Sequence, residues 1–331
     1  MSPSTFPRGS VGLGHDCHAW MLPDGSWGWS NAGLIVGEGE SLLVDTLFDL
    51  DLAAEMLAGF GPITEGRPIT TVVNTHSDGD HTFGNQLLAA RGAEIVGSVA
   101  TAELVTQDAV ASLQRLKTLD GPAGDFARHI FAPFQFDGII ATAPTRTFVD
   151  RMSLHIGGRP VELIQVGPAH TAGDTLVYVP DAQLLYTGDI LFNGGTPVVW
   201  AGPLNRWVAA CDLILDLDVT TIVPGHGAVT DKSAVVAMRD YLVFVESRTT
   251  ELFEDGLTPE QAVEVIDLGP YAGVPESGRI VQNVLNVYHQ LDDALPMPDQ
   301  AGVFGRIAAR EGFLAERSGE KGQPLPQDST A

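Results

Sequence analysis

The stretch TTVVNTHSDGDH, residues 70–81, decides how this chain folds. Its first half is short, apolar and rich in β-branched side chains, which is typical of a buried strand. Its second half packs several potential metal ligands into six residues: His76, Asp78, Asp80 and His81. Gly79 permits the tight backbone path that such convergence needs. The stretch therefore predicts a metal site in the turn between a strand and a helix at residues 80–91.

Four more polar motifs follow apolar stretches elsewhere in the chain. They are LLVDT with Asp45, GPAHTAGD (167–174) with His170, YTGDI (186–190) with Asp189, and PGHG (224–227) with His226. Loops at strand ends are where functional sites are built, and glycine lies close to the last three of these side chains. One such histidine alone would more often be structural, but the whole group favours a shared metal centre.

These five motifs together resemble the metallo-β-lactamase superfamily, whose HxHxDH signature is here HxDxDH. The resemblance covers about residues 30–230. It implies an α+β fold of four layers, αββα, and two bound divalent metal ions. It also implies a ligand set, with His76, Asp78 and His170 at the first metal, Asp80, His81 and His226 at the second, and Asp189 bridging both.

Asp78 departs from the family pattern, because most of the superfamily has histidine at this position. A carboxylate is a shorter, anionic and harder ligand than imidazole. Zinc is the metal that the resemblance implies first, and iron or manganese is the alternative, since flavodiiron proteins of the superfamily carry glutamate there. A further interpretation is that Asp78 only hydrogen-bonds a ligand and leaves the first site weak.

Hydrophobic periodicity predicts a core at residues 1–230, accessory helices at 231–316 and a flexible tail at 317–331. After a polar start, strands are expected at residues 33–37, 41–46, 70–75, 94–97, 147–150, 161–166, 175–180, 183–188 and 221–225, of which 147–188 would form one meander. Helices are expected at 49–60, 80–91, 102–119, 124–134 and 205–217, and Thr258, Pro259 and Gln261 predict the start of another. The helical insertion at about 101–145 is either a substrate lid or simple packing.

Composition narrows the classes of partner. The 331 residues carry 18 Lys and Arg against 42 Asp and Glu, a formal charge of −24, which argues against nucleic acid and anionic membrane surfaces as partners. Two cysteines, no signal peptide and no apolar run of membrane-spanning length predict a cytoplasmic protein. Oligomeric state is left open by the sequence.

The resemblance predicts a hydrolase for an ester, thioester or lactone bond in a small, fairly apolar molecule. A hydroxide shared by two cations would attack, with Asp80 or Asp78 orienting it or moving a proton. Asn193 and Trp200 are the expected substrate contacts, since they lie close to the motifs. The alternatives are a metallo-β-lactamase-type polyketide cyclase or thioesterase, and a dimetal iron redox protein.

Overall fold

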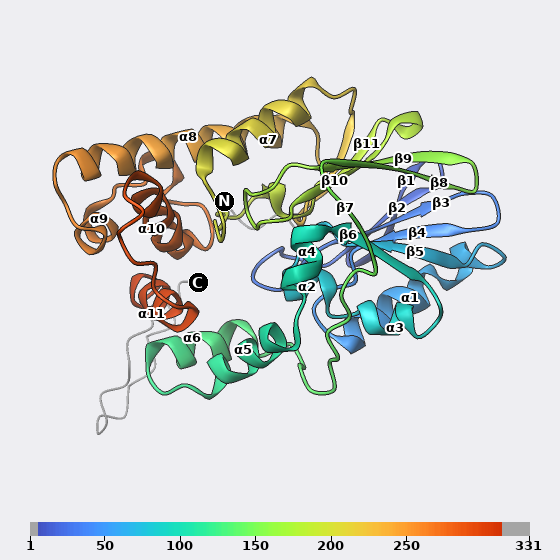
Figure 1. The fold of residues 1–331 in the computed structure, drawn as a ribbon, viewed down its shortest axis with the longest axis horizontal. Coiled ribbons are helices and arrows are strands. Elements are labelled where there is room, and N and C mark those ends of the chain that lie inside the picture. The colour runs from blue at the N-terminus through green and yellow to red at the C-terminus, as the bar shows by residue number, and fades with distance from the viewer. Residues whose placement is uncertain (1–5, 313–331) are drawn as a thin grey trace, which may run out of the picture.

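The computed structural model describes residues 6–312, which fold into four layers with two sheets at the centre (Figure 1). The seven-stranded sheet runs in the order β1-β2-β3-β4-β5-β6-β7, and the five-stranded sheet in the order β13-β11-β10-β9-β8. Helices α1 (Leu50–Thr64) and α3 (Asn85–Ala89) cover the first sheet, and α7 (Leu204–Asp216) covers the second. The expected αββα fold is confirmed.

The strands of the first sheet are β1 (Gly9–Gly14), β2 (Cys17–Met21), β3 (Ala32–Val36), β4 (Ser41–Val44), β5 (Ile69–Val73), β6 (Glu94–Ser98) and β7 (Arg146–Phe148). Those of the second are β8 (Arg151–Ile156), β9 (Arg159–Gln165), β10 (Thr175–Val179), β11 (Leu184–Tyr186) and β13 (Thr221–Val223). Two short strands, β12 (Phe192–Asn193) and β14 (His226–Gly227), pair beside the metal motifs.

Strand β4 shows how one short sequence serves two layers. Its side chains alternate between the faces of the sheet, as the strand geometry requires. Leu42 and Val44 belong to the apolar cluster between the two sheets, together with Leu163 of β9. Leu43 belongs to the other cluster, which also holds Phe60 of α1. Because both faces are covered, Leu42, Leu43 and Val44 are apolar in succession instead of alternating with polar residues.

The direction of the strands brings the motifs together. Strands β4, β5, β6 and β7 are parallel neighbours in the first sheet, and β11 is parallel to β13 in the second. The chain therefore leaves β4 and β5 at the same edge, where Asp45 and His76 follow. A backbone hydrogen bond from Thr175 N to Thr75 O, 2.8 Å long, joins that edge to the second sheet.

Three expectations about the strands are wrong. The polar start contains β1 and β2, which pair antiparallel and extend the first sheet at its edge. Strand β7 pairs with β6 in the first sheet and does not belong to the meander of the second. Strand β8, which pairs antiparallel with β9, was not anticipated. Of these strands, β1, β7 and β8 lie at sheet edges and mix polar with apolar residues, so their pairing depends on neighbours rather than on a local pattern.

The predicted helix at residues 80–91 is interrupted, and α2 (Gly79–Thr82) precedes the separate helix α3. At the break, a side chain on Gly84 would place its Cβ 2.2 Å from Thr46 O, so the backbone approach requires glycine. The insertion divides similarly. It forms α4 (Val99–Leu104), α5 (Gln107–Thr118) and α6 (Pro122–Ile130), and the Thr106 side chain caps α5.

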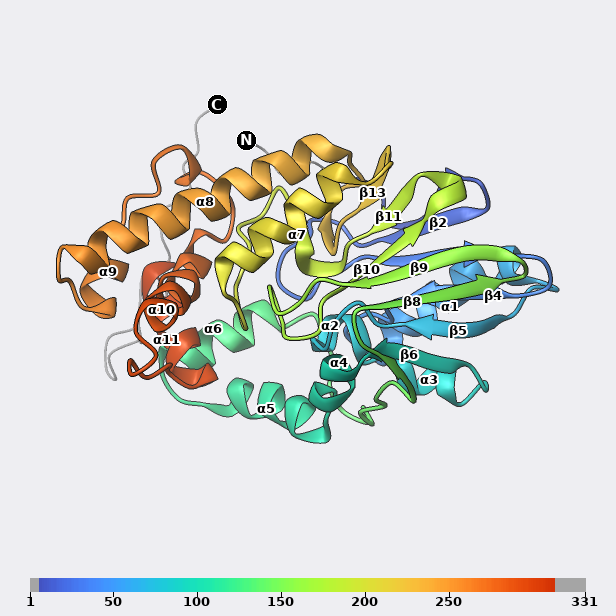
Figure 2. The same cartoon turned by 45° about the horizontal axis from the view of Figure 1, so that its top comes forward.

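The C-terminal helices are α8 (Lys232–Glu254), α9 (Pro259–Val265), α10 (Ile280–Leu291) and α11 (Gln300–Arg310). The predicted capping box of α9 is confirmed, with Thr258 and Gln261 as its members. Helix α11 packs against α6 of the insertion, and both views show them side by side (Figure 2). The predicted tail at 317–331 and the end of the accessory segment, 313–316, lie outside the described residues. No helix within residues 6–312 is long and apolar enough to cross a membrane.

Candidate metal centre

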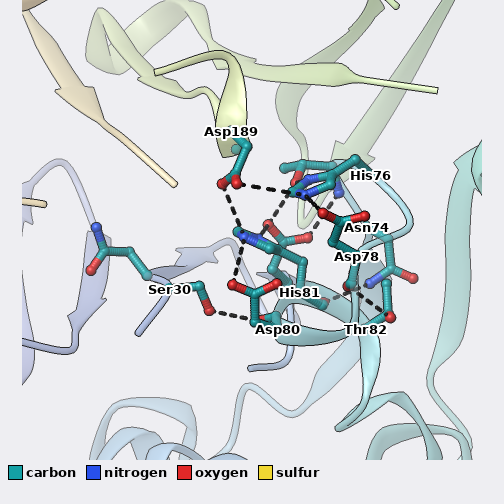
Figure 3. A network of polar contacts seen from close by, with 12 residues as sticks. Ser30, Asn74, His76, Asp78, Asp80, His81, Thr82 and Asp189 are labelled. Atoms are coloured by element: carbon teal, nitrogen blue, oxygen red, sulfur yellow. Dashed lines mark hydrogen bonds and ion pairs between the residues drawn. The ribbon is translucent and has the colours of Figure 1, made fainter. Parts of the chain in front are cut away.

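The seven predicted ligands lie together in one cluster. His76, Asp78 and His170 form one group whose ligand atoms lie within 4.8 Å of one another, and Asp80, His81 and His226 form a second such group. A third group joins His76 and His81 to Asp189. Figure 3 shows Asp189 reaching down between the histidines from the second sheet. Side chains from both sheets therefore meet at one point.

Asp189 contacts all four histidines. Its Oδ2 lies 3.4 Å from the Nε2 atoms of both His170 and His226, and 3.9 Å from His76 Nε2. Its Oδ1 lies 3.0 Å from His81 Nε2. Each histidine thus directs Nε2 at the carboxylate that lies between the two groups. This is the position that a bridging ligand would require.

Glycine gives Asp189 the space it needs. Asp189 lies in a short 3-10 turn, Gly188–Ile190, directly after β11. A Cβ atom on Gly225, which follows β13, would lie 2.0 Å from Asp189 Oδ1. The backbone after β13 therefore passes close enough to the carboxylate that only glycine fits there. The glycine before His226 in the PGHG motif is therefore explained by the space that the Asp189 carboxylate occupies.

Asp45 holds the His81 ring on the side that faces away from Asp189. The sequence motif alone did not predict this role. Its carboxylate accepts hydrogen bonds from Thr75 N (2.8 Å) and Thr75 Oγ1 (2.7 Å). Its Oδ2 also lies 2.8 Å from His81 Nδ1. With the proton held on Nδ1, Nε2 of His81 presents a lone pair to the cluster. Val198 O has the same effect on His170, because it lies 2.7 Å from His170 Nδ1.

The donor atoms fit a pair of divalent cations. His76 Nε2, His81 Nε2 and Asp189 Oδ1 are buried and have no hydrogen-bond partner within the described chain. Buried polar atoms without partners are costly, so native proteins satisfy nearly all of them. Four aspartates surround the four histidines, which leaves an excess of negative charge for cations to balance: Asp45, Asp78, Asp80 and Asp189.

The charges within the cluster shift its titration. Burial opposes protonation of His81, but Asp189, Asp45 and Asp80 outweigh it and raise the pKa of that imidazole well above its usual value. Burial and the positive charge of His81 lower the pKa of His76 well below its usual value. Protons and metal ions compete for the same nitrogen atoms, so metal binding should release protons.

A cavity of about 440 Å³ opens over this cluster. Ligand side chains of both groups line it, Asp78 and His226 among them. Its walls are largely aromatic and aliphatic, from the insertion, from α11 and from loops of the core: Trp27, Phe48, Phe83, Leu104, Leu113, Phe131, Phe192, Trp200 and Phe304. Such a size and lining suit a small, fairly apolar ligand.

The two predicted substrate contacts differ in their positions. Trp200 lines the cavity. Asn193 is not among its lining residues, and its side-chain amide donates to Ala228 O at 2.8 Å. This bond ties the segment at β12 to the one after β14, so the Asn193 side chain is already engaged in holding the backbone. Trp207 is buried behind His170, and its Nε1 donates to Ile190 O.

The profile described as the Metallo-beta-lactamase superfamily matches residues 25–226, more than half of the chain. The chain belongs to the metallo-β-lactamase superfamily. A linear primary-alkylsulfatase from Pseudomonas sp. is 25% identical over 264 residues, which cover 70% of this chain and 48% of that protein. An acyl-coenzyme A thioesterase from Bos taurus is 22% identical over 212 residues, covering 60% of this chain and 72% of that one.

Among solved structures, a stereoselective inverting sec-alkylsulfatase from Pseudomonas sp. shares the fold, with a TM-score of 0.64 and 16% identity. The likeness covers 88% of this chain, and so extends past the superfamily core into the C-terminal helices, and 52% of that one. This chain spans about half the length of the alkylsulfatases that it resembles.

Sequence reasoning missed Arg279, which is the one lysine or arginine among the described residues that line the cavity. It lies far beyond the superfamily core, at the end of a 3-10 turn, Ser277–Arg279, and only 1% of it is exposed. Its guanidinium lies 4.1 Å from the ring centroid of Trp27 and pairs with Glu276 at 2.9 Å. No motif marks this position, since its role depends on distant residues.

Proposed function

We propose that this superfamily member is a metal-dependent hydrolase that cleaves an ester, thioester or lactone bond in a small, fairly apolar molecule. The single observation behind the proposal is the placement of Asp189 between two His–His–Asp groups at the base of an apolar cavity. The relatives named as an alkylsulfatase and a thioesterase support hydrolysis of ester-like bonds. Cytoplasmic location and the lack of nucleic-acid or membrane partners stay predictions.

In this proposal, His76, Asp78 and His170 would hold one cation and Asp80, His81 and His226 would hold the other, with Asp189 placed between the two groups. Two divalent cations when bound would make water a stronger nucleophile and polarise the substrate. Asp45 and Val198 O fix the imidazoles of His81 and His170 in the orientation that ligands need. The aromatic and aliphatic walls offer water few polar partners beside the cluster, which strengthens the electrostatic interactions there.

Asp78 and Asp80 are the groups proposed to handle the proton. The Asp78 side chain is 31% exposed and that of Asp80 is 14% exposed, and both line the cavity. One of these carboxylates takes a proton from a water molecule while the oxygen of that water forms a bond to the substrate carbonyl carbon. The bond to the leaving oxygen or sulfur then breaks, and the leaving group receives the proton. Water supplies all the atoms that the products gain.

The test is a panel of chromogenic esters, thioesters and lactones, with metal analysis of the same preparation. About two bound ions per chain are expected, together with activity that is lost in a strong chelator and restored by divalent metal. Activity that persists in chelator with no bound metal would contradict the proposal. So would a protein that binds two ions and cleaves no member of the panel.

Asp78 makes the two groups of donor atoms alike, and this bears on which metal they would bind. Each group offers two imidazoles and one carboxylate, and Asp78 Oδ2 lies 3.2 Å from His170 Nε2. Two imidazoles with one carboxylate suit iron or manganese as well as zinc. The two groups are therefore chemically alike, which favours occupancy of both by the same metal. The donor set keeps the iron redox alternative in place, whereas no described residue favours the cyclase.

Asp78→His is expected to increase the ratio of bound zinc to bound manganese roughly tenfold, because imidazole is a softer ligand than carboxylate. The measurement is elemental analysis of protein produced in medium with equal zinc, iron and manganese. Asp216→His, on the exposed end of α7, is the matched control and should leave the ratio unchanged. An unchanged ratio in Asp78→His would mean that Asp78 is not a ligand.

A further inference from the structure

A second cavity lies next to the catalytic one. Its volume is about 310 Å³, and it is lined on one side by apolar residues of the insertion and of the loop before β3, including Trp29, Ile130 and Pro133. Glu276 and Glu311 line it too. Of all the described residues, Trp27 is the one that lines both cavities. Trp27 therefore lies where the two cavities approach each other.

The ring of Trp27 lies between residues that belong to different cavities. Towards the catalytic cavity, its centroid lies 5.7 Å from that of Phe304 and 6.5 Å from that of Trp200. Towards the second cavity it meets Phe126 edge-on, with centroids 6.3 Å apart and ring planes at 89°. The guanidinium of Arg279 lies over the same ring. The indole thus forms a wall with a cavity on each side.

Hydrogen bonds hold the backbone of this wall in place. Trp27 N donates to Glu276 Oε1 at 3.0 Å, and Glu276 Oε2 pairs with Arg279 Nη2 at 2.9 Å. Arg279 Nη1 in turn donates to Thr196 O at 2.8 Å. Glu276 itself has a left-handed backbone, φ 59°, which is uncommon for a residue with a side chain. The C-terminal segment therefore clamps Trp27 from outside the superfamily core.

We propose that Trp27 limits the size of the substrate by closing the catalytic cavity against the second one. The inference rests on the proposed function and adds the substrate class, which is compact molecules whose apolar part fits the catalytic cavity alone. Without the indole, an unbranched alkyl chain would extend into the second cavity. Its far end could not be a carboxylate, because Glu311 lines the second cavity and would repel it, while the charge of Glu276 is already balanced by Arg279.

The first test needs no hydrolysis. Affinities of n-alkanols from butanol to dodecanol are measured by calorimetry on the holoprotein, with wild type, Trp27→Ala and Trp27→Phe. Each buried methylene should tighten binding about fourfold. In the wild type this gain should stop at the length that fills the catalytic cavity. In Trp27→Ala it should continue to longer alkanols, and Trp27→Phe, which keeps a smaller ring, should fall between the two.

Trp29→Ala is the matched control, because Trp29 lines the second cavity alone, with its ring centroid 4.8 Å from that of Phe134. It removes the same side chain from the same loop but leaves the wall intact, so its alkanol profile should stop where that of the wild type does. A Trp27→Ala protein with a wild-type profile, a cooperative melt and full metal content would overturn the proposal. If Trp27→Ala does not fold, the proposal is overturned by a folded Trp27→Phe protein whose alkanol profile matches that of the wild type.

The second test uses the proposed activity. With p-nitrophenyl esters from acetate to dodecanoate, kcat/KM of Trp27→Ala for the longest ester, relative to the shortest, should rise at least tenfold over the wild-type ratio. If neither the wild type nor the variants cleave any ester while the alkanol profiles are as expected, the proposed function is refuted but the role of Trp27 as a wall stands. Unchanged ratios in an active Trp27→Ala protein would refute the wall.

Discussion

Asp189→Asn is expected to lower kcat/KM by roughly 10³-fold and to reduce the bound metal from about two ions to one or fewer per chain. The carboxylate lies between the Nε2 atoms of four histidines, and its Oδ1 is buried without a hydrogen-bond partner. An amide has the same shape but no charge, and its nitrogen cannot act as a ligand. Steady-state kinetics and elemental analysis on one preparation measure both effects.

Asp212→Asn provides the matched control for this substitution. Asp212 is an exposed residue of α7 that pairs with Arg239 at 2.5 Å, away from the cluster. Surface pairs of this kind contribute about 1 kcal/mol or less, so its activity and metal content should match the wild type. An Asp189→Asn protein with two bound ions and activity within tenfold of wild type would show that no bridging carboxylate is needed.

Asp45→Asn is expected to weaken metal binding by about 10- to 100-fold, although Asp45 lies outside both ligand groups. The buried carboxylate accepts from Thr75 N, Thr75 Oγ1 and the Nδ1 side of His81. An amide in its place directs N–H groups at one of these donors, so the His81 ring loses its fixed orientation. Competition with a chromogenic chelator measures the metal affinity.

The same substitution should lower the free energy of unfolding of the metal-free protein by about 3 kcal/mol, because it breaks a buried pair. Asp49→Asn is the control, since Asp49 is similarly buried but caps α1 and belongs to none of the ligand groups. Its metal affinity should not change. Equal metal affinities for Asp45→Asn and wild type would mean that His81 is oriented by other contacts.

The sequence predicted which side chains lie together in the cluster, because they follow strands whose apolar character is local. His76 and Asp78 lie in the loop after β5, and parallel pairing of β4 with β5 puts Asp45 at the same edge. Each ligand could therefore be assigned from its own motif. The strands β1, β2 and β8 escaped prediction, and β7 was predicted at 147–150 but in the wrong sheet, because pairing with neighbouring strands, and not a local pattern, decides these assignments.

From the sequence by itself came the set of side chains able to bind metal and, through the family resemblance that these motifs carry, the αββα fold, since both are carried by short stretches. The cavity above these side chains, in contrast, is formed only by the tertiary structure. Trp27 and Arg279 lie at opposite ends of the chain, yet the guanidinium lies 4.1 Å from the ring centroid. Such contacts depend on how distant helices pack, and packing has no signature within either segment.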